Sequence, residues 1–335
     1  MADQIAVWAV CLALSVAAPH LAERTISLDR LRPMTAAAVW AAGLALRATA
    51  AVAAVLLAVI CLPHTRVVRD WLHGLPLRAG SDLGIVLLVC GGLAAAAGYA
   101  VLRRFRAADR EVLSRVRLLD IEGPGGAAVV SDPQVLLAAV GVRRPRIVVS
   151  AGALAALDDD ELDAALAHEH GHIRRGHRWI AAAAEVCTIL ARWLPGTRRA
   201  ADELAFHLER DADWWAVRRL HEPAVLAAAV CKAALDAADP GGAAGAHALT
   251  GGRGGQVARR LHLLLDGVPT GSRPGNAVVR LGAVGLAALA ACAFAVTATH
   301  AGADLLRCLE PHVSATSGTA PVFAPGTGAA DGPAA

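Results

Sequence analysis

The sequence predicts a mainly helical membrane protein, with about four spanning helices and a hydrophilic domain inserted between the third and the fourth. Two observations carry this prediction. The 335 residues are 56% hydrophobic and 18% charged, with a mean hydropathy of +0.48, whereas soluble domains carry about 25% charged residues. The apolar residues are also concentrated in runs, and a spanning helix needs roughly 20 mostly apolar residues in a row.

Four runs are long and apolar enough, or nearly so, to be spanning helices. They cover about residues 4–20, 36–62, 83–102 and 277–299. The first run lacks the basic start of a signal peptide and further runs follow it, so we expect it to be retained as an anchor. Arg47 lies inside the second run. Because a charge is costly in lipid, we expect its side chain to face other helices or a wet cavity.

The arginines beside these runs set the predicted orientation, because short cytoplasmic loops carry an excess of basic residues. The best fit puts the membrane domain (1–102) with its N-terminus outside, the hydrophilic domain (103–276) in the cytosol, and the tail (300–335) outside. The tail is rich in Gly, Pro, Ala and Thr, and we expect it to be disordered. The net charge of +3 is too small to indicate direct nucleic-acid binding, and the seven cysteines form no CxxC pair that would indicate a metal.

A candidate metal site lies in residues 167–177, which read AHEHGHIRRGH. The acidic residues ahead of it suit a helix start, so the predicted helix begins near Asp159 and passes through His168 and His172. Four residues apart, these two histidines share a face and can hold one ion. With Glu169 they match HExxH, in which two imidazoles bind zinc and the glutamate polarises a zinc-bound water. A histidine-rich run can also be an adventitious metal tract.

A second predicted helix, residues 201–220, supplies the remaining groups. Glu209 and Asp213 are spaced i, i+4 and therefore share a face. A catalytic zinc ion has three protein ligands and one open position, so Glu209 is the predicted third ligand. Asp213 is predicted to accept a hydrogen bond from the far nitrogen of a ligand histidine and to fix its tautomer. The alternative, in which Glu209, Arg210 and Asp213 form a solvated charged face, is disfavoured by the HExxH motif upstream.

Other polar residues keep open roles. His170 points to the wrong side of the helix for a ligand, so we interpret it as a second-sphere or surface residue. His177 either touches the site or interacts with the C-terminus of its helix. A transition-state oxyanion needs a donor, and His177, His207 and Arg210 are all candidates.

A strand is predicted before the site helix, over Arg146–Ser150, because this β-branched run follows a proline. We expect Ile147, Val148 and Val149 to form an exposed edge that holds an extended peptide substrate by main-chain pairing. The alternative is an ordinary strand of a small sheet.

Together these motifs resemble the BlaR/MecR-type membrane metallopeptidases: the strand RIVVS, the run LDDDELDAALAHEHGH, a histidine at position 177 and LERDAD, all ahead of the last span. They are more distantly similar to the HtpX-like and CAAX-prenyl zinc proteases, which share HExxH…ExxxD. The resemblance implies a gluzincin-like, mainly helical domain with a small sheet. It also implies one Zn²⁺ per chain held by His168, His172 and Glu209, with Glu169 as general base and then acid and Asp213 as partner of a ligand histidine.

The resemblance implies a zinc endopeptidase of a bacterial cell membrane that cleaves a cytosolic protein, for example a BlaI/MecI-like transcriptional repressor. The expected partners are this protein or peptide substrate and the lipid bilayer. The best-known family members carry a large extracellular penicillin-binding domain after the last span, whereas only about 35 residues without an SxxK motif follow here, so we do not expect direct β-lactam sensing. Two alternatives stay open: an HtpX-like protease for membrane protein quality control, and a non-catalytic signalling scaffold with a structural zinc.

Overall fold

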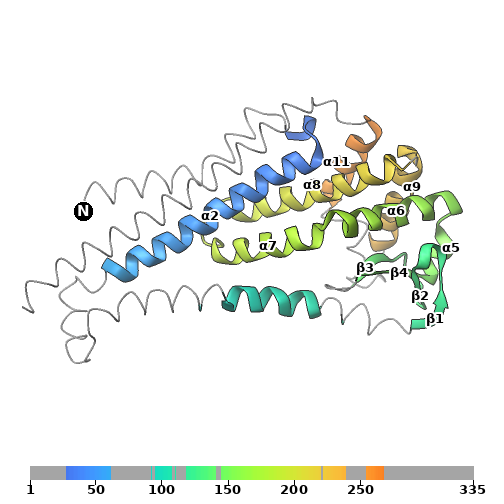
Figure 1. Ribbon diagram of the computed structural model, residues 1–335. Helices are drawn as coiled ribbons and strands as arrows, with labels where there is room; N and C mark the ends of the chain where they lie inside the picture. The colour runs from blue at the N-terminus through green and yellow to red at the C-terminus, as the bar shows by residue number, and fades with distance from the viewer. Residues whose placement is uncertain are drawn as a thin grey trace, which may run out of the picture.

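The structure is a computed structural model, and it describes residues 28–61, 92, 95–107, 110, 118–140, 145–219, 222–238 and 254–267. Long helices form an elongated body, and a small sheet lies at one end of it (Figure 1). The predicted mainly helical fold with a small sheet is therefore confirmed. The predicted spans 4–20 and 277–299, most of 83–102, and the tail lie outside the described residues, so the four-span topology stays a prediction.

Helix α6 (Asp159–Arg175) begins at the predicted residue because Asp158 caps it. The Asp158 carboxylate accepts the backbone N–H of Glu161, and the Glu161 carboxylate accepts that of Asp158. This reciprocal pair satisfies two amides that a helix start leaves without partners. The helix ends at Gly176, whose φ of 67° is left-handed, a conformation that glycine adopts without strain. The chain then starts α7 (His177–Leu190) at once.

Helix α2 (Pro33–Cys61) packs against α8 (Thr197–Val217) and α7. Arg47 in α2 donates to the carbonyl of Gly196 at the start of α8, over 3.1 Å. Asp29, ahead of α2, lies beside Arg210 far along α8, so the two helices run in opposite directions. A shared apolar cluster joins them, with Ala36, Trp40 and Leu44 from α2 and Ala200, Leu204 and Leu208 from α8. The Arg47 side chain is fully buried among these helices, as expected.

The start of α2 is also the stretch of the described chain that could cross a membrane by length and composition. Residues Pro33–Val52 meet that test, but half of the window is buried inside the protein. Core helices of soluble proteins meet the same test, so this finding gives weak support for association with a membrane. The predicted membrane domain (1–102) and hydrophilic domain (103–276) share one packed core through α2.

The described sheet has the order β1 (Leu118–Glu122), β2 (Ala128–Val130), β4 (Arg146–Ser150) and β3 (Leu137–Val140). Strands β2 and β4 are parallel, and the other two pairs are antiparallel. The strand predicted over residues 146–150 is confirmed as β4. The prediction that it offers a free edge at Ile147, Val148 and Val149 is wrong, because β4 is hydrogen-bonded to β2 on one side and β3 on the other. An apolar run buried on both faces is typical of an interior strand. The edge strands of the described sheet are β1 and β3, and β3 is the one that contacts α6.

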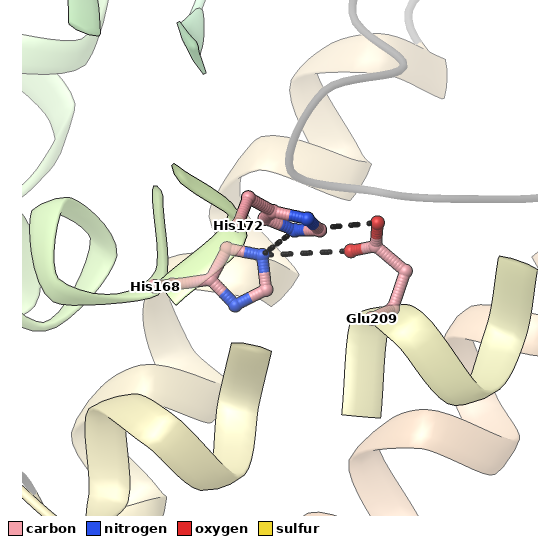
Figure 2. A group of neighbouring side chains, drawn as sticks. All are labelled: His168, His172 and Glu209. Carbon is pink, nitrogen blue, oxygen red and sulfur yellow. Dashed lines mark hydrogen bonds and ion pairs between the residues drawn. The ribbon is translucent and has the colours of Figure 1, made fainter. Parts of the chain in front are cut away.

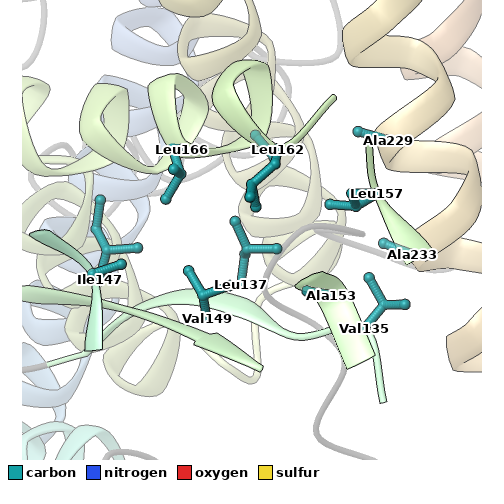
Figure 3. Packing of buried hydrophobic residues seen from close by; sticks show 12 residues of the cluster. Val135, Leu137, Ile147, Val149, Ala153, Leu157, Leu162, Leu166, Ala229 and Ala233 are labelled. Carbon is teal, nitrogen blue, oxygen red and sulfur yellow. The ribbon is translucent and has the colours of Figure 1, made fainter. Parts of the chain in front are cut away.

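Helix α6 lies over the sheet on a layer of apolar side chains (Figure 3). Leu162 and Leu166 of α6 pack in one cluster with Leu137, Ile147 and Val149 from β3 and β4. Helix α9 (Pro223–Ala238) adds Ala229 and Ala233. Further described elements are η1 (Leu28–Arg30), η3 (Pro124–Gly126), α5 (Ala151–Ala156) and α11 (Gly254–Leu265), and residues 95–107 are also helical. This core fixes the distance between α6 and β3, and the geometry of the candidate site depends on that distance.

The packing of α2 on α8 can be tested with two leucines of very different exposure. Leu204 is 1% exposed and Leu235 is 74% exposed. We expect Leu204→Ala to lower the free energy of unfolding by about 2–5 kcal/mol, because it leaves a cavity between the helices. The matched change Leu235→Ala should stay within about 0.5 kcal/mol of the parent. The measurement is denaturant unfolding in detergent followed by circular dichroism, and equal effects would contradict the described α2–α8 core.

Candidate metal centre

Three side chains with metal-binding atoms meet where α6 lies against α8. His168, His172 and Glu209 each offer one ligand atom, and these atoms all lie within 4.8 Å of one another (Figure 2). The two histidine Nε2 atoms are 3.0 Å apart. Each of them is 3.5 Å from a different carboxylate oxygen of Glu209. The structure thus brings together the three residues that the sequence predicts as ligands.

The spacing of these atoms fits a single zinc ion. Ligands bound at about 2.0–2.1 Å in tetrahedral geometry lie about 3.3 Å from one another. The three separations of 3.0, 3.5 and 3.5 Å bracket that value. Two imidazoles and one carboxylate are also a donor set that catalytic zinc uses, with the fourth position left open. The residues present therefore fit the zinc ion that the sequence predicts.

Asp213 holds the far nitrogen of His168. Its Oδ1 lies 2.9 Å from His168 Nδ1, so the Nδ1 proton is donated to the carboxylate and the Nε2 lone pair is left for a metal. His168 is fully buried and Asp213 is 3% exposed. Asp213 therefore contacts the far nitrogen of a predicted ligand histidine, as the sequence predicts, and that histidine is His168.

Arg260, on α11, is a site residue that the sequence did not predict. It is 2% exposed. Its Nε and one terminal nitrogen each donate to Asp213 over 2.6 Å, and its Nη1 donates to Glu209 over 3.0 Å. A buried carboxylate is stable only when its charge is paired, and Arg260 pairs two of them at once. The only sequence signal is an arginine within the apolar helix VARRLHLLL, which does not say what it faces.

The pKa values describe a charged cluster at the site. Burial opposes ionisation of Glu209, but the two imidazoles and Arg260 outweigh it and hold the pKa of that carboxyl well below its usual range. The pKa of Asp213 is lowered in the same way, mainly by Arg260 against the effect of burial. For His168, burial is outweighed by the hydrogen bonds with Asp213 and Glu209, which raise the pKa of the metal-free imidazole to about 9, so a bound metal ion would replace the proton on Nε2. Both carboxylates are thus ionised at neutral pH, in the form that binds a cation.

Glu169 is fixed beside the sheet edge. It is 3% exposed, and its Oε2 accepts the backbone N–H of Ala139 in β3 over 3.0 Å. Within the described part of the chain its other oxygen, Oε1, is buried without a hydrogen-bond partner. Burial raises the pKa of Glu169, against the lowering effect of His172 and His168. A carboxylate with a raised pKa and one oxygen without a partner is suited to take up and release a proton.

The edge strand β3 forms hydrogen bonds with side chains next to the site. The N–H of Ala139 is taken by Glu169, and its carbonyl accepts a hydrogen bond from Arg178 over 3.0 Å. The sequence did not predict this contact, because its apolar run pointed to β4 rather than β3 as the edge. Ala139 therefore joins β3 to α6 through Glu169 and to α7 through Arg178.

The remaining predicted residues lie in two places. His177 contacts His172, with 3.1 Å between their Nδ1 atoms. His207 and Arg210 bond to each other over 3.1 Å, and Arg210 also donates to the carbonyl of Asp29. Among the described residues, neither His207 nor Arg210 bonds to a predicted metal ligand, so their use on an oxyanion stays a prediction.

His170 lies off the metal-binding face. Its Nδ1 donates to the carbonyl of Leu166 on its own helix over 2.8 Å. This agrees with its interpretation as a residue outside the ligand set. Packing explains the glycine at the next position, because a Cβ at Gly171 would lie 3.1 Å from the ring of Trp215.

Part of the chain is similar to a known family of peptidases. Residues 103–206 match Peptidase family M48. This match supports a metal-dependent peptidase, and peptidases of this family typically use zinc. The matched range contains His168, Glu169 and His172 and ends before Glu209 and Asp213. No curated protein and no solved structure matches the chain.

The role of Arg260 can be tested through stability. We expect Arg260→Met to lower the free energy of unfolding by about 3–5 kcal/mol, because Asp213 and Glu209 lose their buried counter-charge. Arg218, at the exposed end of α8, gives a matched control, and Arg218→Met should change stability by no more than about 0.5 kcal/mol. Both variants are unfolded with denaturant in the presence of a chelator, so that metal binding does not contribute. A loss for Arg260→Met no larger than the control would show that the ion pairs are not formed.

Proposed function

We propose that this protein is a zinc-dependent endopeptidase held at a membrane, with His168, His172 and Glu209 as the ligands of one zinc ion. The observation that carries the proposal is the placement of Glu169, a buried carboxylate fixed to the sheet edge, directly beside three groups spaced as ligands of one ion. The match to a peptidase family supports the class of reaction.

A zinc ion held there supplies Lewis acidity, which polarises a substrate carbonyl and lowers the pKa of a water molecule toward neutrality. Glu169 takes one proton from the attacking water while the water oxygen bonds to the carbonyl carbon. When the C–N bond breaks, Glu169 passes that proton to the leaving amine, and the acyl product is a carboxylic acid. The Ala139 N–H holds Oε2 throughout, so Oε1 is the oxygen that carries the proton. The raised pKa of Glu169, caused by burial, favours holding the proton between the two steps.

The proposed biological role is regulated proteolysis of a cytosolic protein, for example a BlaI/MecI-like repressor, with the peptidase domain on the cytosolic side. Its support is the motif resemblance to BlaR/MecR-type metallopeptidases and the arginines that flank the apolar runs. The 20-residue apolar start of α2 gives weak support for the membrane.

Replacing the proposed general base should separate catalysis from metal binding. Glu169→Gln keeps the size of the side chain and an oxygen for the Ala139 N–H, but it cannot accept a proton. We expect zinc content to stay at about one ion per chain and cleavage of an unstructured protein to fall by about 10²–10⁴-fold. The control is Glu185→Gln, since Glu185 pairs with Arg104 away from the site. Full cleavage by Glu169→Gln with zinc bound would rule out the role of Glu169.

Removing the metal or its third ligand should abolish the reaction by another route. We expect a chelator to stop cleavage by the wild type and added Zn²⁺ to restore it. Glu209→Ala should lose bound zinc and activity together, because two imidazoles alone do not complete the ligand set. Asp202→Ala removes the same charge at an exposed position of the same helix and should keep both. Zinc content by atomic absorption, measured beside cleavage, checks each step, and full zinc occupancy in Glu209→Ala would overturn the ligand assignment.

A further inference from the structure

We infer that His177 is a positioning residue that fixes the tautomer of His172, so that the Nε2 of His172 is free to bind the metal. The inference rests on the proposed metal centre and assigns a role to a histidine that is not a ligand. His177 is the first residue of α7 and is 2% exposed. Its Nδ1 lies 3.1 Å from Nδ1 of His172, and its Nε2 lies 3.1 Å from Oδ2 of Asp211.

The chain of contacts begins at Asp211 on α8. This carboxylate is 1% exposed and receives two hydrogen bonds from Arg175, over 2.7 and 3.0 Å. An ionised carboxylate can only accept hydrogen bonds. The group 3.1 Å away, Nε2 of His177, must therefore carry a proton and donate it to Asp211.

Each proton position then sets the next. A neutral imidazole has one donor and one acceptor nitrogen, so Nδ1 of His177 is left as the acceptor. Its neighbour at 3.1 Å, Nδ1 of His172, must be the donor. The lone pair of His172 is thereby placed on Nε2, the atom that lies 3.0 Å from Nε2 of His168 and 3.5 Å from Glu209. With the opposite tautomer, His172 would point an N–H at the ligand cluster and could not bind a metal.

Helix α8 thus orients both ligand histidines through two aspartates. Asp213 reaches His168 directly over 2.9 Å. Asp211 is two residues away and so faces a different side of the helix, and no contact joins it to His172 directly within the described residues. His177 bridges that gap. Gly176, in the left-handed conformation, separates α6 from α7, and His177 follows it directly and lies against His172.

The test is zinc affinity of the full-length protein in detergent, measured by competition with a chromophoric chelator for Zn²⁺ alone. His177→Phe keeps a ring but no nitrogen, and we expect zinc to bind about 10–100-fold more weakly, the usual loss when an outer partner of a ligand histidine is removed. His177→Asn places an amide oxygen near the position of Nδ1, where it can accept the His172 proton, and should recover most of that loss. His170→Phe is the control, since His170 lies on the same helix as His172 and, among the described residues, its side chain bonds to the Leu166 carbonyl of its own helix and to no predicted ligand.

A second readout reports the tautomer itself. The ¹⁵N shifts of the histidine side chains in the zinc-free protein should place the His172 proton on Nδ1 in the wild type and in His177→Asn. In His177→Phe we expect a mixture that includes the Nε2–H form. A merely structural role for His177 would change stability without moving this proton.

The outcomes separate the inference from the proposed function. Unchanged zinc affinity in His177→Phe, or a folded His177→Asn that loses zinc as fully as the Phe variant, overturns the role of His177. If His177→Phe does not fold, the Asn variant still decides, because weak zinc binding or an Nε2–H form of His172 in it contradicts the inference. If the wild type itself binds no zinc, the proposed metal centre fails. If the wild type binds zinc and cleaves while His177→Phe binds zinc equally well, only the inference fails.

Discussion

The close contact of α6 with α8 is the constraint on which the rest of the site depends. Metal ligands spread over two helices meet only if the helix axes come near each other, and small residues permit this. Ala164 on α6 and Ala216 on α8 are fully buried and belong to one apolar cluster. Gly171 leaves room for the ring of Trp215, because a Cβ at position 171 would lie only 3.1 Å from that ring. A larger side chain at these positions would separate the helices and with them the predicted ligands.

That contact buries more negative charge than α6 and α8 can neutralise by themselves. Glu209, Asp213 and Glu169 all lie at or near it. A buried charge without a partner destabilises a protein by several kcal/mol, and Arg260 arrives from α11 to pair with two of these carboxylates. The docking of α11 and the integrity of the metal centre are therefore linked. Whatever stabilises the assembled cluster also stabilises α11 in its place, because both belong to the same folded state.

Local spacing explains how much of this could be predicted from the sequence. Residues four apart on a helix share a face whatever the surroundings, so the sequence alone pairs His168 with His172 and Glu209 with Asp213. The cap at Asp158 and the strand over Arg146–Ser150 are equally local. The sequence could not predict contacts that depend on how the helices and strands are rotated relative to one another. Arg260 is separated from Asp213 by 47 residues, and the partner of His177 depends on the rotation of α8.

For the same reason, the sequence alone could not settle the two expectations that concerned apolar runs. A run such as Ile147, Val148 and Val149 fits an edge strand or an interior one, and only the pairing with both β2 and β3 decides between them. The run that forms α2 fits a lipid-facing helix or a core helix, because alanine, leucine and tryptophan serve in both. In the structure Trp40 and Leu44 are covered by the cluster shared with α8, but only half of the apolar window is buried, so packing does not decide between the two for α2.

The burial of α2 has a mechanical consequence for the site. Asp29, just before α2, accepts hydrogen bonds from Arg259 over 2.7 and 3.3 Å, and Arg259 also pairs with Glu203 of α8. Its neighbour Arg260 holds Asp213. The two arginines of α11 thus join the start of α2 to the predicted metal centre through one helix. Near its middle α2 is tied again, where Arg47 donates to Gly196. Sliding α2 along α8 would break both ties, so the apolar helix and the candidate site form a single structural unit.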